Sequence, residues 1–260
     1  MAVRRIALVT GASSGIGLEF ARIHAAAGDD LVIVARRRDA LETLKSELES
    51  QYGVCITVIV ADLSDPAAPA EVFRAVNDLG LAVDCLVNNA GFGGHGLFYE
   101  REWEQDEAMI QLNVMALAEL TRLFLPGMVE RKHGKVLNVA STAGFLPGPL
   151  QAVYYATKAF VLSFSQAISE ELNGTGVTVT ALCPGPVDTG FVKAGNLEGV
   201  ETFEQANSAR TVAEIGYNAM QKGKLLVIDD WKLSVLLNWV MPFLPRKMVL
   251  RMSRQSMEKS

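Results

Sequence analysis

Three residues in the segment 138–159 have side chains that could carry out acid–base chemistry, namely Ser141, Tyr154 and Lys158. Tyr154 and Lys158 are four positions apart, so a helix would project both from one face. A phenol has a pKa of ~10, and an ammonium group beside it favours the phenolate and lowers that pKa. Ser141 follows the apolar run 136–140, which predicts a buried strand. Its hydroxyl could bond a substrate oxygen, so the pattern favours proton transfer to or from a carbinol oxygen.

The spacing of Tyr154 and Lys158 is not specific by itself, because a tyrosine four residues before a lysine is common on helices. Tyr155 is also a second phenol next to the first. The prediction of hydride chemistry on a C–OH/C=O pair therefore depends on the elements that position these residues, and on a nicotinamide beside them.

A glycine-rich turn near the start of the chain predicts a dinucleotide site. The apolar run 5–10 is expected to form a strand, 18–27 a helix that Gly28 closes, and 10–17 (TGASSGIG) the turn between them. Glycines allow a sharp turn, and they let backbone N–H groups approach a pyrophosphate at the positive end of the helix. This placement makes the glycine pattern much more specific than it is alone.

The second predicted strand, 31–35, is followed by three arginines, Arg36 to Arg38. In Rossmann units that bind NAD(H), an acidic residue at this point holds the ribose hydroxyls. Cations suit a 2′-phosphate instead, so the sequence favours NADP(H) over NAD(H). The alternative is a solvated basic start to the next helix, 39–51.

The remaining elements predict one α/β domain with a doubly wound parallel sheet of about seven strands and helices on both faces. Further strands are expected at 55–61, 83–87, 136–140, 177–183 and 224–228, and further helices at 69–79, 104–130 with a break at Pro126-Gly127, 150–172, and 211–222 capped by Thr211. The domain would span 1–230 and include a substrate loop at about 186–210. Polar or glycine residues fall at the carboxyl ends of successive strands, where ligands bind in such sheets: Gly11, Arg36, Asp62, Asn89, Ser141 and Pro184.

Several residues in these loops have two interpretations. Asp62 could accept a hydrogen bond from an adenine amino group or simply begin a turn. Asn113, on an otherwise apolar helix face, could hold a water in a proton path or cap a backbone carbonyl. Asn89 could brace the neighbouring loop or lie close to a ribose. His95 is interpreted as incidental, because no second His or Cys cluster supports a metal.

Composition excludes several classes of function. The chain has 260 residues and a net charge of −5, so it lacks the basic surface of a nucleic-acid-binding protein. Cys55, Cys85 and Cys183 are interpreted as reduced core thiols of a cytoplasmic protein. We expect no signal peptide and no apolar run of the ~18–20 residues that a spanning helix needs.

The tail, residues 231–260, is apolar up to Leu244 and then basic. It is too short to span a bilayer, and Pro242 interrupts it. It could cover the substrate cleft on the same domain, contact a partner subunit, or lie on a membrane surface. A lid or a subunit contact is favoured over membrane binding.

The chain resembles the classical short-chain dehydrogenases/reductases, and in particular the branch with ketoacyl-reductase-like and DltE-like members. The resemblance covers about residues 4–228 and depends on the turn 10–17, Asn-Asn-Ala-Gly at 88–91, Asn113, Ser141, Tyr154-x-x-x-Lys158 and Pro184-Gly185. It implies Tyr154 as general acid/base, Lys158 as the group that lowers its pKa and binds the nicotinamide ribose, Ser141 as the group that polarises the carbonyl, and Asn113 as holder of a relay water.

The resemblance also implies the cofactor contacts. The pyrophosphate would lie along 10–17, the adenine at Asp62 and Leu63, the ribose at Asn89 and the carboxamide at Val187 and Thr189, while Arg36 would select NADP(H). The full predicted cofactor set is Gly11, Ser13, Ser14, Gly15, Ile16, Gly17, Arg36, Arg37, Asp62, Leu63, Asn89, Ala90, Gly91, Tyr154, Lys158, Pro184, Gly185, Val187 and Thr189. Members are often homodimers or homotetramers that pair the Tyr/Lys helix, although the apolar tail differs from the commonest tetramer-forming endings.

The predicted function is NADPH-dependent reduction of a small-molecule ketone or aldehyde, or the reverse oxidation. The alternative is a non-catalytic NADP(H) sensor or partner-binding protein on the same scaffold, which would not need the complete Asn/Ser/Tyr/Lys set. A sugar-nucleotide epimerase fits less well, because extended relatives have another glycine spacing and a longer substrate domain. An apolar set suggests a hydrophobic or acyl-type substrate, with ordinary core packing as the alternative: Phe92, Leu97, Phe98, Phe145, Leu146 and Phe191.

Overall fold

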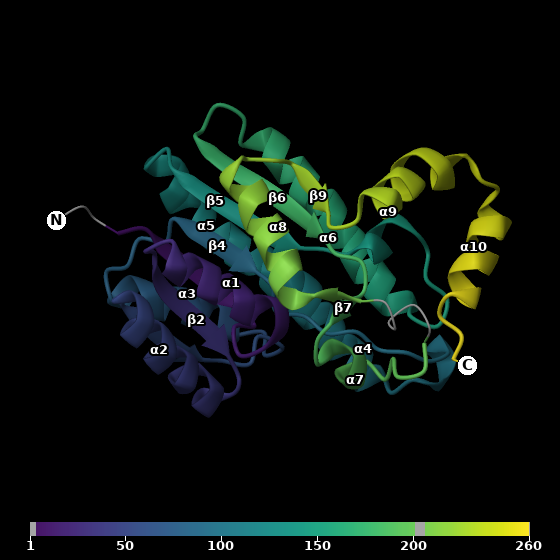
Figure 1. Ribbon diagram of the computed structural model, residues 1–260, viewed down its shortest axis with the longest axis horizontal. Helices are drawn as coiled ribbons and strands as arrows, with labels where there is room; N and C mark the ends of the chain where they lie inside the picture. The colour runs from purple at the N-terminus through teal and green to yellow at the C-terminus, as the bar shows by residue number, and fades with distance from the viewer. Residues whose placement is uncertain (1–3, 201–205, 260) are drawn as a thin grey trace.

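The computed structural model describes residues 4–200 and 206–259 and contains a parallel sheet of seven strands (Figure 1). The strands lie in the order β3-β2-β1-β4-β5-β6-β9. Their bounds are β1 Ile6–Thr10, β2 Asp30–Ala35, β3 Ile56–Val60, β4 Cys85–Asn88, β5 Gly134–Val139, β6 Val177–Cys183 and β9 Leu226–Ile228. Every pairing in the sheet is parallel, which confirms the predicted doubly wound fold.

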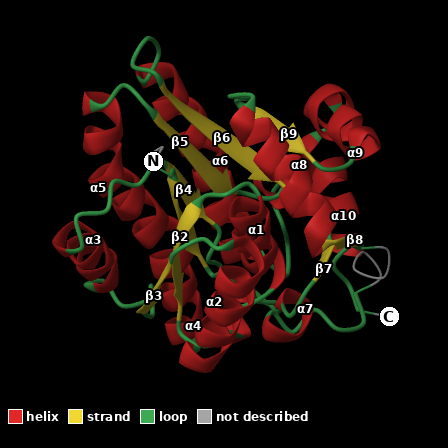
Figure 2. Ribbon diagram, turned by 60° about the vertical axis from the view of Figure 1, so that its left-hand side comes forward, coloured by secondary structure: helices red, strands yellow, loops and turns green. Residues whose placement is uncertain are grey.

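Helices cover both faces of this sheet, as Figure 2 shows. One face packs on α1 (Gly15–Ala26), α2 (Arg38–Tyr52) and α8 (Ala209–Gln221), and the other on α3 (Ala68–Asp78), α5 (Leu117–Glu130) and α6 (Ala152–Glu171). Successive strand residues are buried on opposite faces, as Leu8 is with α3 and α5 and Val9 is with α1 and α8, which explains why the strands read as continuous apolar runs. All seven strands end at the same edge, which therefore collects the residues that follow them.

The helix predicted at 104–130 is interrupted at a different place from the one expected. It consists of α4 (Trp103–Ile110), a π-helical turn η2 (Gln111–Ala116) and α5, with Pro126 inside α5. The predicted break at Pro126 was therefore wrong. Proline removes one hydrogen bond to the carbonyl four residues earlier, and Arg122 at that position is exposed, so water can satisfy the carbonyl.

The segment predicted as an irregular substrate loop contains some regular structure. β7 (Val187–Asp188) pairs in parallel with β8 (Asn207–Ser208), and a short helix α7 spans Phe191–Ala194. Residues 201–205 of this predicted loop lie outside the described residues. The cap of α8 is Ser208, whose side chain accepts from the Thr211 N–H, so the prediction of Thr211 as cap was wrong. Ser208 is in the extended conformation that a cap needs, whereas Thr211 is already helical.

The tail folds as a chain of short helices. It contains α9 (Trp231–Val235), the π-helical η5 (Leu236–Val240), the 3₁₀ turn η6 (Met241–Phe243) and α10 (Arg246–Gln255). Leu237, Met241 and Val249 are buried against a group that includes Phe145 and Leu146. The inner side of the tail thus packs on the loop that follows Ser141. In Figure 1 the tail projects at the far right of the molecule, coloured yellow.

Among the described residues, the helical run Trp103–Glu130 has the length and apolar character of a membrane-crossing helix, but Leu120, Phe124 and Met128 within it are buried in the core.

The three cysteines are free; Cys85 and Cys183 are buried, whereas Cys55 is exposed. The prediction of Cys55 as a core thiol was wrong, because it precedes β3 on an edge of the sheet.

Candidate active site

The ends of β1 and β4 are tied together by a compact set of hydrogen bonds. The Thr10 hydroxyl accepts from the backbone N–H groups of Asn89 and Ala90, both at 3.0 Å. The Asn89 amide donates to the Thr10 carbonyl at 2.9 Å. Asn89 therefore braces the neighbouring loop, which is the first of its two predicted roles. Below it, the buried Asn88 amide donates to Thr121 and Asn138 and fixes the centre of the sheet.

The turn between β1 and α1 has the shape that a pyrophosphate requires. Gly11 and Gly15 have φ of 69° and 58°, which side chains rarely adopt. A Cβ on Gly17 would collide with the Asn89 amide and the Gly11 carbonyl. Ser14 precedes α1 in extended conformation and its side chain makes no cap hydrogen bond, so the first N–H groups of α1 are available to an anion. The turn therefore fits the phosphates of a dinucleotide, with Ser13 and Ile16 completing it.

Charged residues from β2 and β3 lie beside this turn. Arg37 donates to the Ser13 carbonyl at 3.0 Å and to its hydroxyl at 3.1 Å. Arg36 lies 3.7 Å from Asp62, and its side chain is 74% exposed. Two cations next to a phosphate-binding turn would favour a cofactor that carries a 2′-phosphate.

Asp62 adopts the turn that was one of its two predicted roles. Its Oδ1 accepts from the Ser64 N–H at 3.0 Å and from the Ser64 hydroxyl at 2.7 Å. Burial tends to raise the pKa of the Asp62 carboxyl, but these hydrogen bonds and the charge of Arg36 outweigh burial and lower that pKa below its usual value. Leu63 is buried in the core next to α3, so only its backbone lies at the sheet edge.

Ser141, Tyr154 and Lys158 come together where β5 ends and α6 passes. The Ser141 hydroxyl accepts from the Ala143 N–H at 3.1 Å, and the side chain of Ser141 thereby caps η3 (Thr142–Phe145). The Ser141 hydroxyl donates to the Pro184 carbonyl at 3.4 Å, and it lies close enough to the Tyr154 phenol to act on the pKa of that group. Lys158 Nζ donates to the Val139 carbonyl at 2.8 Å and lies 5.8 Å from the centre of the Tyr154 ring. The phenol, the hydroxyl and the ammonium are thus fixed at one strand end.

The pKa of Tyr154 is not lowered as the sequence predicted. Burial of the phenol raises its pKa, and the hydrogen bond from Ser141 compensates only in part. Burial also lowers the pKa of the Lys158 ammonium to about 8. The Lys158 ammonium donates to the Val139 carbonyl rather than to the phenol oxygen. In the protein without cofactor, desolvation is therefore the largest influence on the pKa of Tyr154.

Asn113 lies in the π-helical turn and clamps the loop after β4. Its Nδ2 donates to the Phe92 carbonyl at 2.9 Å and to the Thr157 hydroxyl at 3.2 Å, while its Oδ1 accepts from the Phe92 N–H at 3.2 Å. A Cβ on Gly91 would lie 2.9 Å from that oxygen. The side chain of Asn113 therefore caps backbone groups, the second of its two predicted roles, and it links the loop to α6.

The loop after β6 closes the other side of the site. The Pro184 carbonyl accepts from the N–H of Thr142 at 2.9 Å and from its hydroxyl at 3.1 Å, and the Gly185 N–H donates to Asp229. Val187 is buried in β7. The Thr189 side chain faces Gly15, where an added Cβ would lie 3.1 Å away. This loop thereby joins the glycine-rich turn to the strand end that carries Ser141.

The predicted apolar pocket residues divide into separate groups. Phe191 of α7 lies 5.4 Å from Tyr154 between ring centres and, with Phe92, packs around the phenol. Phe145 and Leu146 pack against the tail instead. Leu97 precedes the 3₁₀ turn η1 (Phe98–Glu100), and Phe98 is 58% exposed. Of this set, Phe92 and Phe191 therefore pack with Tyr154.

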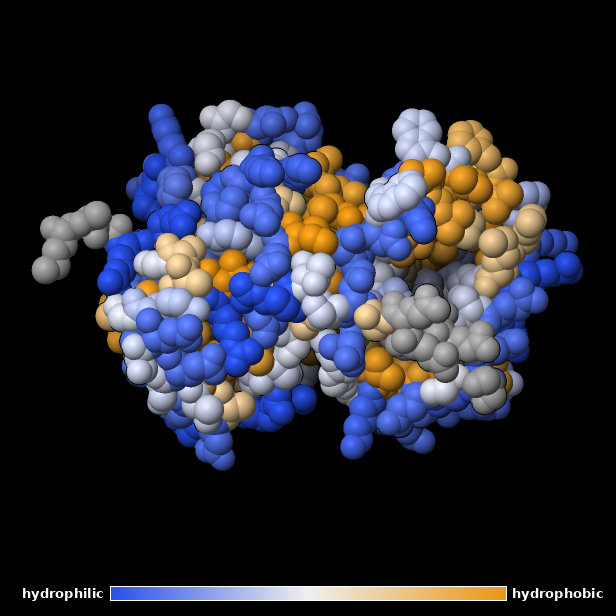
Figure 3. All heavy atoms as spheres, viewed as in Figure 1, coloured by the Kyte–Doolittle hydropathy of each residue, from blue (hydrophilic) through white to orange (hydrophobic). Residues whose placement is uncertain are grey.

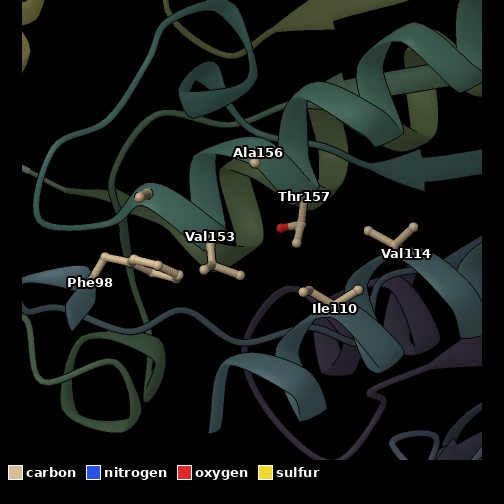
Figure 4. Close-up of a pocket in the computed structure, with 7 residues that line it drawn as sticks. Phe98, Ile110, Val114, Val153, Ala156 and Thr157 are labelled. Carbon is tan, nitrogen blue, oxygen red and sulfur yellow. The ribbon is translucent and has the colours of Figure 1, made fainter. Parts of the chain in front are cut away.

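A separate apolar cavity of about 430 Å³ lies on the outer side of α6 (Figure 4). It is lined by Phe98, Ile110, Val114, Ala152, Val153, Ala156 and Thr157. In Figure 4, Val153 and Thr157 of α6 face Ile110 and Val114 across the opening. Ser141, Tyr154 and Lys158 do not line this cavity.

Sequence reasoning missed the contacts that hold the loops around the site. His95, interpreted as incidental, has its Nε2 2.7 Å from the Met257 carbonyl, and Asp229 also binds Asn207. Residues 95 and 257 are so distant in sequence that no local pattern relates them. The described residues contain no cluster of His, Cys, Asp or Glu that could hold a metal ion.

The family model for short chain dehydrogenases matches residues 5–198. The chain belongs to this family. It is 31% identical over 250 residues to a very-long-chain 3-oxoacyl-CoA reductase of Anas platyrhynchos, covering 95% of the chain and 78% of that protein. A Sphingobium yanoikuyae short-chain dehydrogenase in complex with NADPH superposes with a TM-score of 0.83 at 32% identity, over 89% of this chain and 90% of that one. A 7β-hydroxysteroid dehydrogenase structure gives a TM-score of 0.85 at 28% identity and covers 96% of each chain. The chain is therefore an oxidoreductase of the ketoacyl-reductase-like kind.

Proposed function

We propose that the protein reduces the carbonyl of a hydrophobic or acyl-type ketone to an alcohol with NADPH, or catalyses the reverse oxidation. The observation that carries this proposal is the meeting of Ser141, Tyr154 and Lys158 at one strand end, on the same sheet edge as the phosphate-binding turn.

The roles of the residues follow from their positions. NADPH supplies a hydride to the carbonyl carbon when it is bound. The Tyr154 hydroxyl gives its proton to the carbonyl oxygen, and the Ser141 hydroxyl holds and polarises that oxygen. Because burial raises the pKa of Tyr154, the phenol is protonated near neutral pH and can donate in the reducing direction. The positive charge of Lys158 would stabilise the phenolate that Tyr154 becomes once it has given up its proton.

Two observations support NADP(H) as the cofactor. Arg36 and Arg37 follow β2, at the point where NAD(H)-binding Rossmann units have a carboxylate that holds the ribose hydroxyls. The nearby carboxylate of Asp62 follows β3 instead, and it is hydrogen-bonded to Ser64 and lies 3.7 Å from Arg36. The similar structure from Sphingobium yanoikuyae contains NADPH. The turn 11–17 would hold the phosphates and Arg36 the 2′-phosphate.

The substrate class is inferred from the apolar surroundings of Tyr154 and from the relatives. Phe92, Met109 and Phe191 pack around the phenol and would favour an apolar substituent on the carbonyl carbon. The relative from Anas platyrhynchos is named for a very-long-chain 3-oxoacyl-CoA substrate. A 3-oxoacyl thioester and a bulky apolar ketone are therefore the compounds to test first.

The test is a panel of carbonyl compounds assayed at 340 nm with NADPH and NADH in parallel. Wild-type protein should oxidise NADPH with at least one apolar ketone or 3-oxoacyl thioester, and Tyr154→Phe should lower kcat by 10²-fold or more. Tyr155→Phe is the matched control and should retain activity. Tight NADPH binding without turnover on the whole panel would overturn the proposal and favour a cofactor-sensing protein. Equal turnover with NADH would remove the role given to Arg36.

We also propose that the protein acts in the cytoplasm as a homo-oligomer, a homodimer or a homotetramer. Exposed apolar side chains on α4, η2 and α6 support self-association, since Trp103, Met115 and Phe160 are 55%, 53% and 40% exposed. The three free cysteines support a reducing compartment. Sedimentation velocity would test the first statement: Met115→Glu should shift an oligomer to monomer. Cell fractionation would test the second.

A further inference from the structure

The tail carries a stripe of exposed apolar side chains on its outer side. Trp231, Val235, Trp239 and Phe243 recur every four residues and are 73%, 48%, 73% and 81% exposed. We call these four residues the outer stripe. In Figure 3 apolar surface gathers at the upper right, over the position of the tail in Figure 1. Large aromatic side chains in a contiguous exposed group indicate a surface that binds something.

The outer stripe is not needed to hold the tail on the protein. The opposite side of the same short helices already packs inward through Leu237 and Met241, which reach the loop at Phe145. A tail that only covered the domain would have polar residues on its outer side. The sequence therefore makes this segment apolar on two sides, one for the protein and one for another surface.

Cations flank the outer stripe. Arg246, Lys247 and Arg251 are exposed on α10, and within the described parts of the chain none of them forms an ion pair. Residues 231–260 contain six Lys or Arg and one Glu, a formal charge of +5. The whole chain has 24 basic and 29 acidic residues, so residues 1–230 hold 18 and 28, a charge of −10. The charge of the tail is thus opposite to that of the body.

We propose that the tail binds in the plane of an anionic phospholipid bilayer, with the outer stripe among the acyl chains and the cations of α10 on the headgroups. Tryptophan and phenylalanine with flanking lysine and arginine are the side chains that stabilise such a contact. The helices are too short to cross a bilayer, so they lie on it. A second copy of the chain fits less well, because a symmetric contact would place two tails of charge +5 against each other. This proposal reverses the order of preference that the sequence alone suggested for the tail.

Flotation with vesicles tests the proposal directly. The full chain should float with vesicles of phosphatidylcholine and phosphatidylglycerol and much less with phosphatidylcholine alone, and added salt should weaken the binding. Trp239→Ser and Phe243→Ser should each reduce binding about tenfold, the effect expected for one large apolar side chain. Leu79→Ser removes an exposed apolar side chain at the end of α3 and is the matched control.

A charge series tests the second part of the contact. Lys247→Glu and Arg251→Glu should each reduce binding to the anionic vesicles by about fivefold or more. Arg74→Glu reverses an exposed charge on α3 and should change little. In a Trp103→Phe background, emission from Trp231 and Trp239 should shift to the blue when anionic vesicles are added.

Three outcomes would overturn the proposal. The first is absence of flotation with anionic vesicles, and the second is equal binding by wild type and the Trp239 and Phe243 variants. The third is a tail-dependent dimer in sedimentation velocity that Trp239→Ser dissociates while vesicle binding is absent, which would identify the occupant as a second copy. Circular dichroism and the rate of NADPH oxidation, which do not depend on the outer stripe, show that each variant is folded.

Discussion

At the scale of single residues, the site depends on two buried titratable groups whose pKa values burial moves in opposite directions. The pKa of Tyr154 rises and that of Lys158 falls to about 8. Both shifts favour the neutral form of each group, since the charged form is poorly solvated in the core. In the proposed reaction the phenol therefore starts protonated and donates its proton, while Lys158, with a pKa of about 8, is still mostly an ammonium at pH 7.

The lowered pKa of Lys158 predicts a dependence of stability on pH. The unfolded chain keeps the lysine proton up to its ordinary pKa of 10.5, while the folded protein releases it near 8. Between these values the unfolded state binds more protons, so the free energy of unfolding should rise with pH. Urea unfolding at pH 7.5 and pH 9.5 should show wild type gaining on the order of 2 kcal/mol relative to Lys158→Met. Equal pH dependence of the two proteins would contradict this assignment.

Arg36 predicts a change in cofactor preference. Arg36→Ala should raise the KM for NADPH about tenfold and leave the KM for NADH nearly unchanged, because only NADPH carries the 2′-phosphate. Arg38→Ala is the matched control, since Arg38 is also exposed and lies 3.9 Å from Glu42 on α2. Steady-state kinetics with both cofactors checks it. An equal effect on NADPH and NADH would show that Arg36 acts on the fold or on a shared part of the cofactor.

Residue types and their spacing predicted much of this site, but they did not predict the contacts between residues that are far apart in the sequence. The glycines at 11–17 and the Ser141, Tyr154 and Lys158 group were identified because their spacing has a local reason. The brace between Thr10 and Asn89 and the link between His95 and Met257 depend on how the sheet and the tail fold, so no local pattern marks them. The direction of the Tyr154 shift was missed because a sequence does not show how completely a side chain is buried.

At the scale of elements, the π-helical turn η2 between α4 and α5 is the element that places a polar side chain at the site. It carries Asn113, whose amide holds both backbone groups of Phe92 and the Thr157 hydroxyl of α6. One side chain thus connects the loop after β4 to the helix that carries Tyr154 and Lys158. The sequence predicted a helix and a polar side chain here, but the wide turn has no sequence signal comparable with that of a proline.

Replacing Asn113 should therefore affect both stability and activity. Asn113→Ala removes three hydrogen bonds and leaves the Phe92 N–H and carbonyl without their partner, which should lower the free energy of unfolding by about 2–4 kcal/mol. Asn238→Ala removes an exposed amide that only binds the Ser234 carbonyl within its own helical segment, and it should have little effect. Chemical denaturation of both variants, with kcat measured in parallel, tests this role. An Asn113→Ala protein as stable as wild type would contradict the clamp.

At the scale of the whole molecule, the order of the seven strands brings the site residues to one sheet edge, and the tail holds a neighbouring loop. The topology was predictable because strands and helices alternate along the sequence with clear periodicity. The position of the tail was not, since its contacts join distant segments: Met257 packs with Leu197 and Val200, and Lys259 binds Asn196. The last residues of the chain thus hold the loop that carries Phe191.

Removing these contacts should loosen the loop without unfolding the sheet. A chain that ends after Gln255 loses the Met257 contacts with His95, Leu197 and Val200. We expect faster proteolysis between 190 and 200 and a several-fold lower kcat/KM, because Phe191 would no longer be held over Tyr154. His95→Ala should reproduce part of the effect, and His133→Ala, at an exposed position before β5, should not. Unchanged proteolysis of the shortened chain would show that the loop is held by other contacts.

The unequal distribution of charge between residues 1–230 and 231–260 has a practical consequence for handling the protein. A body of charge −10 joined to an end of charge +5 is a strong electric dipole. At neutral pH the body would bind an anion-exchange resin while the opposite end would bind a cation-exchange resin, although the pI of about 5.3 suggests only the first. Retention on both columns at low salt would make their sequential use an efficient purification, and reversing Lys247 and Arg251 would abolish it on the second.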